Sequence, residues 1–287
     1  MTVRVGLVGA GPWATSFTGP MLAAGPGTSL AAVWARRPEA ARALGVPVAD
    51  SFDALLGTCD AVAFAVPPDV QAELAPRAAA AGKHLLLEKP VAFGLEAAER
   101  VAAAADAAGV VTQLMLTNRW SAAVPEFVER VRTAGPRVLR AEFVGSGAMP
   151  GSFFATPWRR PEAALPDVGP HVFDLLESAA GPATVVHARR AGAVTAVTFE
   201  HAGGAVSSAV LSIATPGAHG PMRCEAITDG GRIDLADPGA EDPATVQRRI
   251  ASTFAEAVAS GKSPSPDVHR GLELQRLLTA AEAALKS

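Results

Sequence analysis

VRVGLVGAGPWA, at residues 3–14, is the stretch of this 287-residue sequence that decides the fold. Its first half is apolar and rich in β-branched residues, which predicts a strand. Its second half has the G-x-G-x-x-A spacing where that strand turns into a helix, the context in which the spacing indicates dinucleotide binding. Gly9 permits the tight turn, Gly11 lets a pyrophosphate approach the backbone, and Ala14 lets the helix pack closely on the strand. Pro12 suits the first helical position, and the helix N-terminus attracts phosphate. We therefore expect Gly9, Gly11, Pro12, Trp13 and Ala14 to contact a dinucleotide.

Residues 1–118 alternate short apolar runs with alanine-rich segments, the pattern of βαβ units around a parallel sheet. The expected strands are 3–8, 29–34, 60–66, 83–87 and 110–115, and the expected helices are 12–24, 38–44, 69–81 and 95–108. The first helix should kink or break at Gly19-Pro20. The third strand ends abruptly at a helix start, and such strand ends line the ligand crevice of open α/β sheets. Val66, Pro67, Pro68 and Gln71 are therefore predicted to contact the cofactor.

From residue 119 the pattern changes to alternating polar and apolar runs, which indicate a mostly antiparallel open sheet. The expected strands are 138–144, 184–190, 193–200, 204–213, 223–228 and 231–235, and the expected helices are 122–133, 169–179, 245–260 and 268–285. The predicted fold class is α/β, with an N-terminal Rossmann domain at 1–118 and a C-terminal α+β domain at 119–287.

Composition excludes several classes of function. A formal net charge of -3 gives no electrostatic reason to expect nucleic acid, and no apolar run approaches the roughly 20 residues of a membrane span. Two cysteines in unrelated contexts argue against a disulfide framework, and dispersed histidines argue against a metal site. The N-terminus is interpreted as a strand and not as a signal peptide, so a cytoplasmic location is expected. The absence of tyrosine excludes reductases that use a tyrosine hydroxyl as the proton donor.

Two positions suggest catalytic chemistry. Lys89 follows an apolar strand, where its ammonium group can stabilise a developing alkoxide, although a strand-end lysine reaching solvent is an equal alternative. Asp167 and His171 are four residues apart in a predicted helical segment, so they project to the same side. A carboxylate there can orient the imidazole as a general acid and base; a helix N-cap aspartate beside an unrelated histidine is the alternative. Asp174 is predicted to be structural.

Several segments spread over nearly the whole chain resemble one enzyme family. The most specific is AGKHLLLEKP at 81–90, and the others are Asn118-Arg119, DVGPHVFD at 167–174, DGGRI at 229–233 and Gly271-Leu272. With these segments the chain resembles the glucose–fructose oxidoreductase and inositol dehydrogenase family (Gfo/Idh/MocA). The resemblance implies NAD(P)-dependent interconversion of a secondary alcohol and a ketone on a sugar or cyclitol. It also implies a homodimer or homotetramer formed through the C-terminal sheet.

Within this resemblance, Lys89, Asp167 and His171 are the predicted catalytic residues, and Glu88 joins the predicted cofactor contacts. His171 is the expected proton shuttle and Lys89 the electrostatic aid, although the sequence leaves their assignment open. The substrate is expected to meet Lys89, Asp167 and His171 together with Asn118, Arg119 and Trp158. A hinge role for Asn118 and Arg119 and a core role for Trp158 remain alternatives.

The second strand ends in Trp34-Ala35-Arg36-Arg37. An NAD-selective site usually has an acidic residue here, about 20 residues beyond the glycines, to bind the ribose hydroxyls. Ala35 followed by Arg36 and Arg37 would instead accept a 2′-phosphate by charge-assisted hydrogen bonds. NADP is therefore the predicted cofactor, with NAD as the alternative.

Two departures from the family pattern leave the substrate open. Gln71 stands where many members have histidine, and residues 161–166 replace the usual glycine run. A reductase of a non-sugar substrate, such as an imine, a diol or a tetrapyrrole, remains an alternative. A non-catalytic NAD(P)-sensing protein is a second alternative, although a sensor needs none of the three predicted catalytic residues.

Overall fold

The computed structural model describes residues 2–218 and 220–286, which form two compact units. The first unit comprises Met1–Met115 and Pro243–Glu273, and the second comprises Leu116–Asp242 and Leu274–Ser287. The single division at residue 118 predicted from sequence therefore differs from the structure, because Pro243–Glu273 groups with the first unit.

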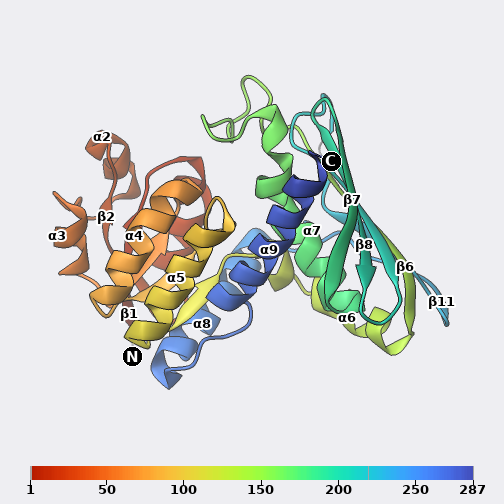
Figure 1. Cartoon of the computed structure of the whole chain (residues 1–287). Coiled ribbons are helices and arrows are strands. Elements are labelled where there is room, and N and C mark those ends of the chain that lie inside the picture. Colours follow the sequence, from red (N-terminus) through yellow and green to blue (C-terminus); the bar gives the residue numbers. More distant parts are fainter. Residues whose placement is uncertain (1, 219, 287) are drawn as a thin grey trace. The chain divides into compact units, whose positions relative to one another are not determined.

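The first unit is built on a five-stranded parallel sheet, as predicted (Figure 1). The strands lie in the order β2-β1-β3-β4-β5, so the strand order reverses at β1. Ligands of such sheets bind beyond the carboxyl ends of the strands at this switch point. The bounds are β1 (Val3–Val8), β2 (Thr28–Trp34), β3 (Ala61–Phe64), β4 (His84–Leu87) and β5 (Thr112–Leu114).

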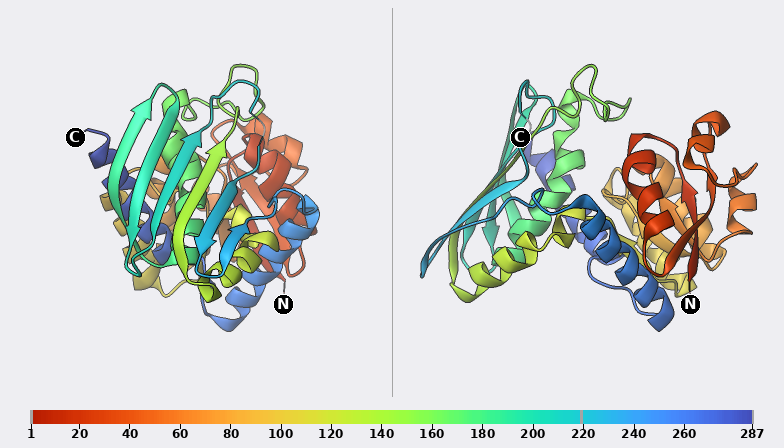
Figure 2. Two further views of the ribbon diagram at one scale, coloured as in Figure 1. Left: turned by 90° about the vertical axis from the view of Figure 1, so that its right-hand side faces the viewer. Right: turned by 180° about the vertical axis from the view of Figure 1, so that it is seen from behind.

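Helices cover both faces of this sheet (Figures 1 and 2). They are η1 (Ala14–Thr18), α1 (Gly19–Ala24), α2 (Pro38–Ala41), η2 (Arg42–Leu44), α3 (Phe52–Leu56), α4 (Pro68–Ala80), α5 (Leu95–Ala108) and α8 (Pro243–Ser260). The backbone stays right-handed helical through Thr18 and Gly19, where a π-helical turn passes into α-helix, so the predicted break at Gly19-Pro20 is absent. The short helix α3 was not predicted. Ser51 caps it by accepting a hydrogen bond from the Ala54 N–H, and Phe52 and Leu55 anchor it in the core.

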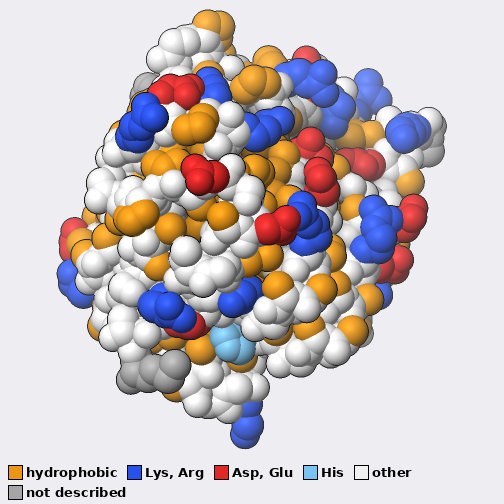
Figure 3. All heavy atoms as spheres, turned by 90° about the vertical axis from the view of Figure 1, so that its left-hand side faces the viewer, with side chains coloured by type: hydrophobic (Ala, Val, Ile, Leu, Met, Phe, Trp, Pro, Cys, Tyr) orange, Lys and Arg blue, Asp and Glu red, His pale blue; other side chains and the backbone are white. Residues whose placement is uncertain are grey.

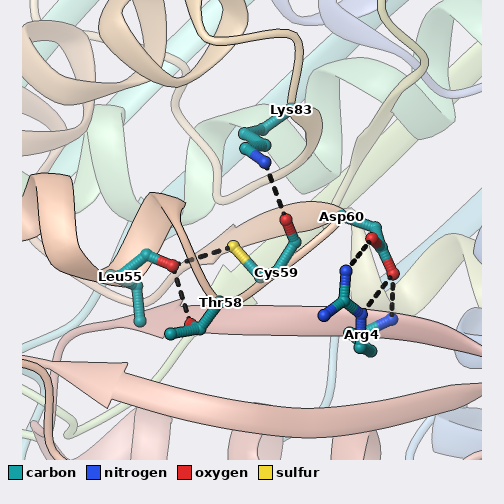
Figure 4. A network of polar contacts seen from close by, with 6 residues as sticks. All are labelled: Arg4, Leu55, Thr58, Cys59, Asp60 and Lys83. Atoms are coloured by element: carbon teal, nitrogen blue, oxygen red, sulfur yellow. Dashed lines mark hydrogen bonds and ion pairs between the residues drawn. The ribbon is translucent and has the colours of Figure 1, made fainter.

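A polar network fixes the amino-terminal ends of the strands, opposite the switch-point edge (Figure 4). Arg4 of β1 forms an ion pair of 2.6 Å with Asp60, the residue before β3, and Lys83 donates to the Cys59 carbonyl oxygen at 2.9 Å. The hydrogen bond from Arg4 lowers the pKa of Asp60. Burial raises the pKa of the Cys59 thiol, so this side chain serves packing and not redox chemistry.

The second unit is built on a six-stranded sheet in the order β11-β10-β6-β9-β8-β7. Only β6 and β9 pair in parallel, and the remaining neighbours are antiparallel, which confirms the predicted mostly antiparallel sheet. The bounds are β6 (Pro136–Val144), β7 (Ala183–Ala191), β8 (Val194–His201), β9 (Val206–Ser212), β10 (Arg223–Thr228) and β11 (Gly231–Asp234). The left view of Figure 2 shows one face of this sheet turned outward without a covering helix.

The helices of the second unit are α6 (Ala123–Thr133), α7 (Ala164–Ala180) and the C-terminal part of α9 (Val268–Ala284), with short turns η3 (Thr117–Trp120) and η4 (Pro161–Ala163). Helix α7 begins at Ala164, five residues before the predicted start at 169. Pro166 lies in its first turn, where no N–H is needed, and nearly all of the helix is buried, so burial outweighs the weak helix propensity of Gly169-Pro170.

Three further properties concern the cysteines, the surface charge and the helices. Cys224 and Cys59 are buried free thiols, and burial raises the pKa of Cys224 to about 12. The face shown in Figure 3 carries Lys and Arg side chains interspersed with Asp and Glu. Among the helices of residues 2–218 and 220–286, none combines the length and the apolar character that crossing a bilayer requires.

Candidate functional site

The glycine loop after β1 has the geometry of a nucleotide cradle. Gly9 has φ +112°, and a Cβ atom there would lie 2.4 Å from the Ala65 carbonyl oxygen, so only glycine fits. A Cβ atom at Gly11 would meet nothing within 4 Å, so the loop is open on that side. Ala14 is fully buried at the base of the helix. The loop therefore fits a dinucleotide pyrophosphate as the sequence predicts.

Trp13 connects the glycine loop to the end of β4. Its ring stacks on Phe17 with centroids 4.5 Å apart, and its indole Nε1 donates to Glu88 Oε1 at 2.6 Å. Glu88 is 9% exposed. Its carboxylate also accepts from the Lys89 backbone N–H at 3.3 Å. Two segments 75 residues apart in the sequence are thus joined at the carboxyl edge of the sheet.

Gln71 lies in the first turns of α4, within the helix predicted at 69–81. Its side chain is fully buried, and its amide is hydrogen bonded to the backbone of residues 88–91. The Gln71 side chain therefore holds that segment. Pro67 is the N-cap residue of α4 and Val66 precedes it; both are half-buried at the end of β3, and Pro68 is buried.

Positive charge follows β2. Trp34 is the last residue of that strand, Ala35 is half-buried, and Arg36 and Arg37 are exposed. Arg37 is the N-cap residue of α2, so the two arginines lie in the turn between strand and helix. The acidic residue of this helix is Glu39, in its first turn. The turn therefore offers guanidinium groups where NAD-selective sites have a carboxylate.

Asp167 and His171 lie one turn apart on α7, and both are buried, at 6% and 8% exposure. The N-cap residue of this helix is Ala163, so Asp167 is inside the helix and the N-cap alternative is wrong. The His171 ring lies 6.1 Å from that of Phe143 on β6. The pair therefore occupies the packed face of the second unit.

Arg159 precedes the Asp167 segment and could wall the pocket together with Trp158, but the sequence did not reveal that it pairs with Asp167. Its Nε lies 3.1 Å from Asp167 Oδ2, and its guanidinium stacks over the Trp158 ring at 4.8 Å from the centroid. Both side chains of the ion pair are mostly buried: 16% of the Arg159 side chain and 9% of the Asp167 side chain are exposed. Arg159 lies in the irregular segment before η4, where no periodic spacing points to Asp167. The pair orients the carboxylate in the second unit.

Asn118 and Arg119 lie in η3 at the start of the second unit. Arg119 forms a 2.7 Å ion pair with Asp174, whose side chain is 4% exposed. This contact gives Asp174 the structural role predicted for it and ties η3 to α7. Asn118 Nδ2 lies 4.0 Å from the Met222 sulfur. Within the described part of the chain, no three His, Cys, Asp or Glu side chains gather as a metal-binding group.

The fold and the glycine loop define a class: a nucleotide-binding protein with a doubly wound first unit and a second α+β unit. Residues 3–116 match the model of the oxidoreductase family with an NAD-binding Rossmann fold that is abbreviated GFO_IDH_MocA. This confirms the family resemblance and the NAD(P)-binding oxidoreductase class predicted from the sequence. A search of curated proteins finds no match to the chain.

Solved structures share the fold over the whole chain at low identity. A levoglucosan dehydrogenase with NADH and levoglucosan has a TM-score of 0.85 at 18% identity, covering 100% of this chain and 98% of that one. The WlbA dehydrogenase from Bordetella pertussis, with NADH and UDP-GlcNAcA, has a TM-score of 0.86 at 22% identity, covering 99% and 96%. A putative myo-inositol dehydrogenase from Sinorhizobium meliloti 1021 has a TM-score of 0.84 at 20% identity, covering 99% and 98%.

Proposed function

We propose that this protein is an NADP-dependent oxidoreductase that interconverts a secondary alcohol and a ketone on a sugar-like or cyclitol substrate. The observation that carries the proposal is the location of Lys89 beside the glycine loop of a domain that matches an NAD-binding oxidoreductase family. Buried hydrogen bonds between the Gln71 amide and the Glu88 backbone fix this segment. The buried Asp167–Arg159 pair and His171 on one helix support a proton-transfer role for the second unit. A protein that only sensed the nucleotide would need none of these groups.

The proposed chemistry divides between the two units. A nicotinamide cofactor, held by the glycine loop after β1 and by the turn after β2, would supply the hydride to the carbonyl carbon or accept it from the alcohol. In the reducing direction His171 gives a proton to the carbonyl oxygen, and the Lys89 ammonium group stabilises the negative charge that develops on that oxygen. Asp167 orients the imidazole, and the Arg159 guanidinium, 3.1 Å away, fixes the location of the Asp167 carboxylate. Substrate hydroxyl contacts from Asn118, Arg119 and Trp158 are part of the same proposal.

The preference for NADP rests on Arg36 and Arg37 after β2. Arg36→Ala should weaken NADPH binding by about tenfold or more, the equivalent of about 1.4 kcal/mol, and leave NADH binding nearly unchanged. Fluorescence titration of both cofactors measures the ratio. Arg42→Ala, an exposed arginine one turn farther along the same segment, is the matched control. Equal losses for NADPH and NADH in the Arg36 variant would remove the basis for the preference.

Substrate class is tested by following nicotinamide absorbance with NADPH or NADH against keto-sugars, inososes and simple cyclic ketones. Turnover of a polyhydroxylated ketone with NADPH supports the proposal. Turnover confined to a non-sugar ketone or imine would replace the substrate class, and tight cofactor binding without turnover on an extended panel would favour the sensor.

We also propose that the uncovered face of the second sheet joins copies of this chain. Val206 and Val210 of β9 and Ile227 of β10 are 43%, 37% and 36% exposed, and the strand register puts all three on one face of the sheet. Ion pairs run beside them, with Arg140 2.8 Å from Glu225. Light scattering should give the mass of a dimer or tetramer, and Val210→Asp should reduce it. A monomeric wild-type protein would contradict this assembly.

A further inference from the structure

The segment after β4 loses its strand partners while it is still buried. Glu88, Pro90 and Val91 are at most 9% exposed, so their backbone groups need hydrogen-bond partners inside the protein. Lys89, the proposed catalytic lysine, lies in the middle of this segment and is half-buried. Whatever satisfies the backbone of residues 88–91 therefore also fixes where the Lys89 side chain begins.

One side chain provides those partners. Gln71 Oε1 accepts from the Glu88 N–H at 2.8 Å, and Gln71 Nε2 donates to the carbonyl oxygens of Glu88 at 2.8 Å and Val91 at 2.9 Å. The Pro90 carbonyl oxygen is also within reach, at 3.3 Å from the same nitrogen. A primary amide has two N–H donors and a carbonyl oxygen that accepts. Both donors and the carbonyl oxygen of Gln71 are therefore engaged by the residues on both sides of Lys89.

We propose that Gln71 is a positioning residue for Lys89: it sets the location of the ammonium group by clamping the backbone before and after it. This inference rests on the proposed function of Lys89. The amide is uncharged and fully buried, so it acts through geometry and not through the field at the reacting atoms. Misplacement of a reacting group by about 1 Å can lower the rate by about 10²-fold.

The chain contains a matched control for this proposal. Gln113 of β5 is a second glutamine of the first unit that is fully buried, and its Nε2 donates to the Ile250 carbonyl oxygen at 3.2 Å. Gln71→Met and Gln113→Met each remove one buried amide and keep an unbranched side chain of similar length. Both variants should lose stability, but only Gln71→Met releases the backbone around Lys89.

The first readout needs no substrate. The sequence has four lysines, at 83, 89, 262 and 286, so reductive methylation with ¹³C-formaldehyde gives few NMR lines, and Lys89→Met assigns one of them. In Gln71→Met the Lys89 line should move while the other three stay. In Gln113→Met all four should coincide with the wild-type lines.

The second readout is turnover of whichever ketone is reduced in the substrate panel. Gln71→Met should lower kcat by about 10- to 100-fold with little change in the NADPH dissociation constant, and Gln113→Met should remain within about twofold of wild type. If Gln71→Met does not fold, Gln71→Asn keeps the amide but withdraws it from the backbone, and it should show the same pattern.

The two proposals can fail separately. A folded Gln71 variant with an unmoved Lys89 line and wild-type kcat overturns the positioning role, even if Lys89→Met is inactive. Full activity of Lys89→Met overturns the proposed role of Lys89, whereas the NMR comparison still decides whether Gln71 fixes its location.

Discussion

The two units hold their candidate catalytic groups by different physical means. In the first unit, the uncharged amide of Gln71 fixes the backbone around Lys89 through hydrogen bonds of 2.8–2.9 Å with the backbone of Glu88 and Val91. In the second unit, the Asp167 carboxylate is itself bound by the Arg159 guanidinium at 3.1 Å. Neutral buried hydrogen bonds change little with pH or salt, whereas an ion pair depends on the charge of both partners. The Gln71 hydrogen bonds fix the location of the backbone around Lys89. The ion pair with Arg159 fixes the location of the Asp167 carboxylate through the charges of both side chains.

The largest effect expected from breaking this arrangement is loss of the catalytic groups themselves. Lys89→Met and His171→Asn should each lower kcat by about 10²- to 10⁴-fold and leave NADPH binding nearly intact. Steady-state kinetics and a fluorescence titration measure the two quantities. Lys262→Met and His187→Asn, both at exposed positions, are the controls and should behave as wild type. A wild-type rate in either catalytic variant would contradict its assignment.

The charged half of the comparison is tested at Arg159. Arg159→Met leaves the buried Asp167 carboxylate without this partner, so the second unit should lose about 3 kcal/mol of stability, and kcat should fall as well. Adding Asp167→Asn removes the carboxylate charge that the Arg159 guanidinium faces in the wild type, and it should restore part of the lost stability but not the activity. Denaturant unfolding of the two single variants and the double variant measures this coupling.

Arg160 gives the control for this cycle, because it is the adjacent arginine and is exposed. Arg160→Met should unfold as wild type does. Arg159→Lys keeps the charge but not the planar fork, so it should fall between wild type and Arg159→Met. If Arg159→Met and Arg160→Met lose equal stability, the ion pair between Arg159 and Asp167 does not contribute to the free energy of unfolding.

The smallest effect concerns the pH dependence of the first unit. His84 at the start of β4 accepts a hydrogen bond from the Val111 N–H at Nδ1, and burial lowers its pKa, with Asp60 opposing the shift. The unfolded state therefore binds the proton more readily than the folded state does. The contribution of neutral His84 to the free energy of unfolding is complete above pH 6.5 and is lost as the pH falls through the lowered pKa.

His84→Asn retains an acceptor but does not titrate. Between pH 7.5 and about 5.5, the Tm of the variant should fall by about 1–3 °C less than the Tm of the wild type. Thermal unfolding across that range measures the difference, with exposed His187→Asn as the control that keeps the wild-type slope. Parallel curves for wild type and His84→Asn would show that His84 does not contribute.

Sequence reasoning reached the features that local chemistry dictates. Gly9 and Gly11 could be interpreted from a strand–turn–helix pattern because Gly9 answers a requirement of its own backbone and the spacing to Gly11 is local in the sequence. The mostly antiparallel second sheet followed from alternation along each strand. The start of α7 was placed five residues too late, since the burial that stabilises Pro166 and Gly169 within a helix is a property of the tertiary structure.

The partners of the site residues were beyond the sequence for a related reason. Gln71 meets residues 17–20 positions away, and Trp13 meets Glu88 75 positions away, distances for which no helical or strand period gives a rule. Arg159 precedes Asp167 by eight residues across an irregular segment. Residue type predicted which side chains carry chemistry, and the fold alone determined what holds them.

Isotope transfer tests the central claim most directly. The protein is incubated with the ketone found in the substrate panel and with NADPH carrying deuterium on one face of nicotinamide C4, and the product alcohol is analysed by mass spectrometry. Our account predicts that one of the two C4-labelled forms delivers a single deuterium to the carbinol carbon, and that Lys89→Met suppresses the transfer. Alcohol formed without deuterium from either labelled form would contradict direct hydride transfer by this protein.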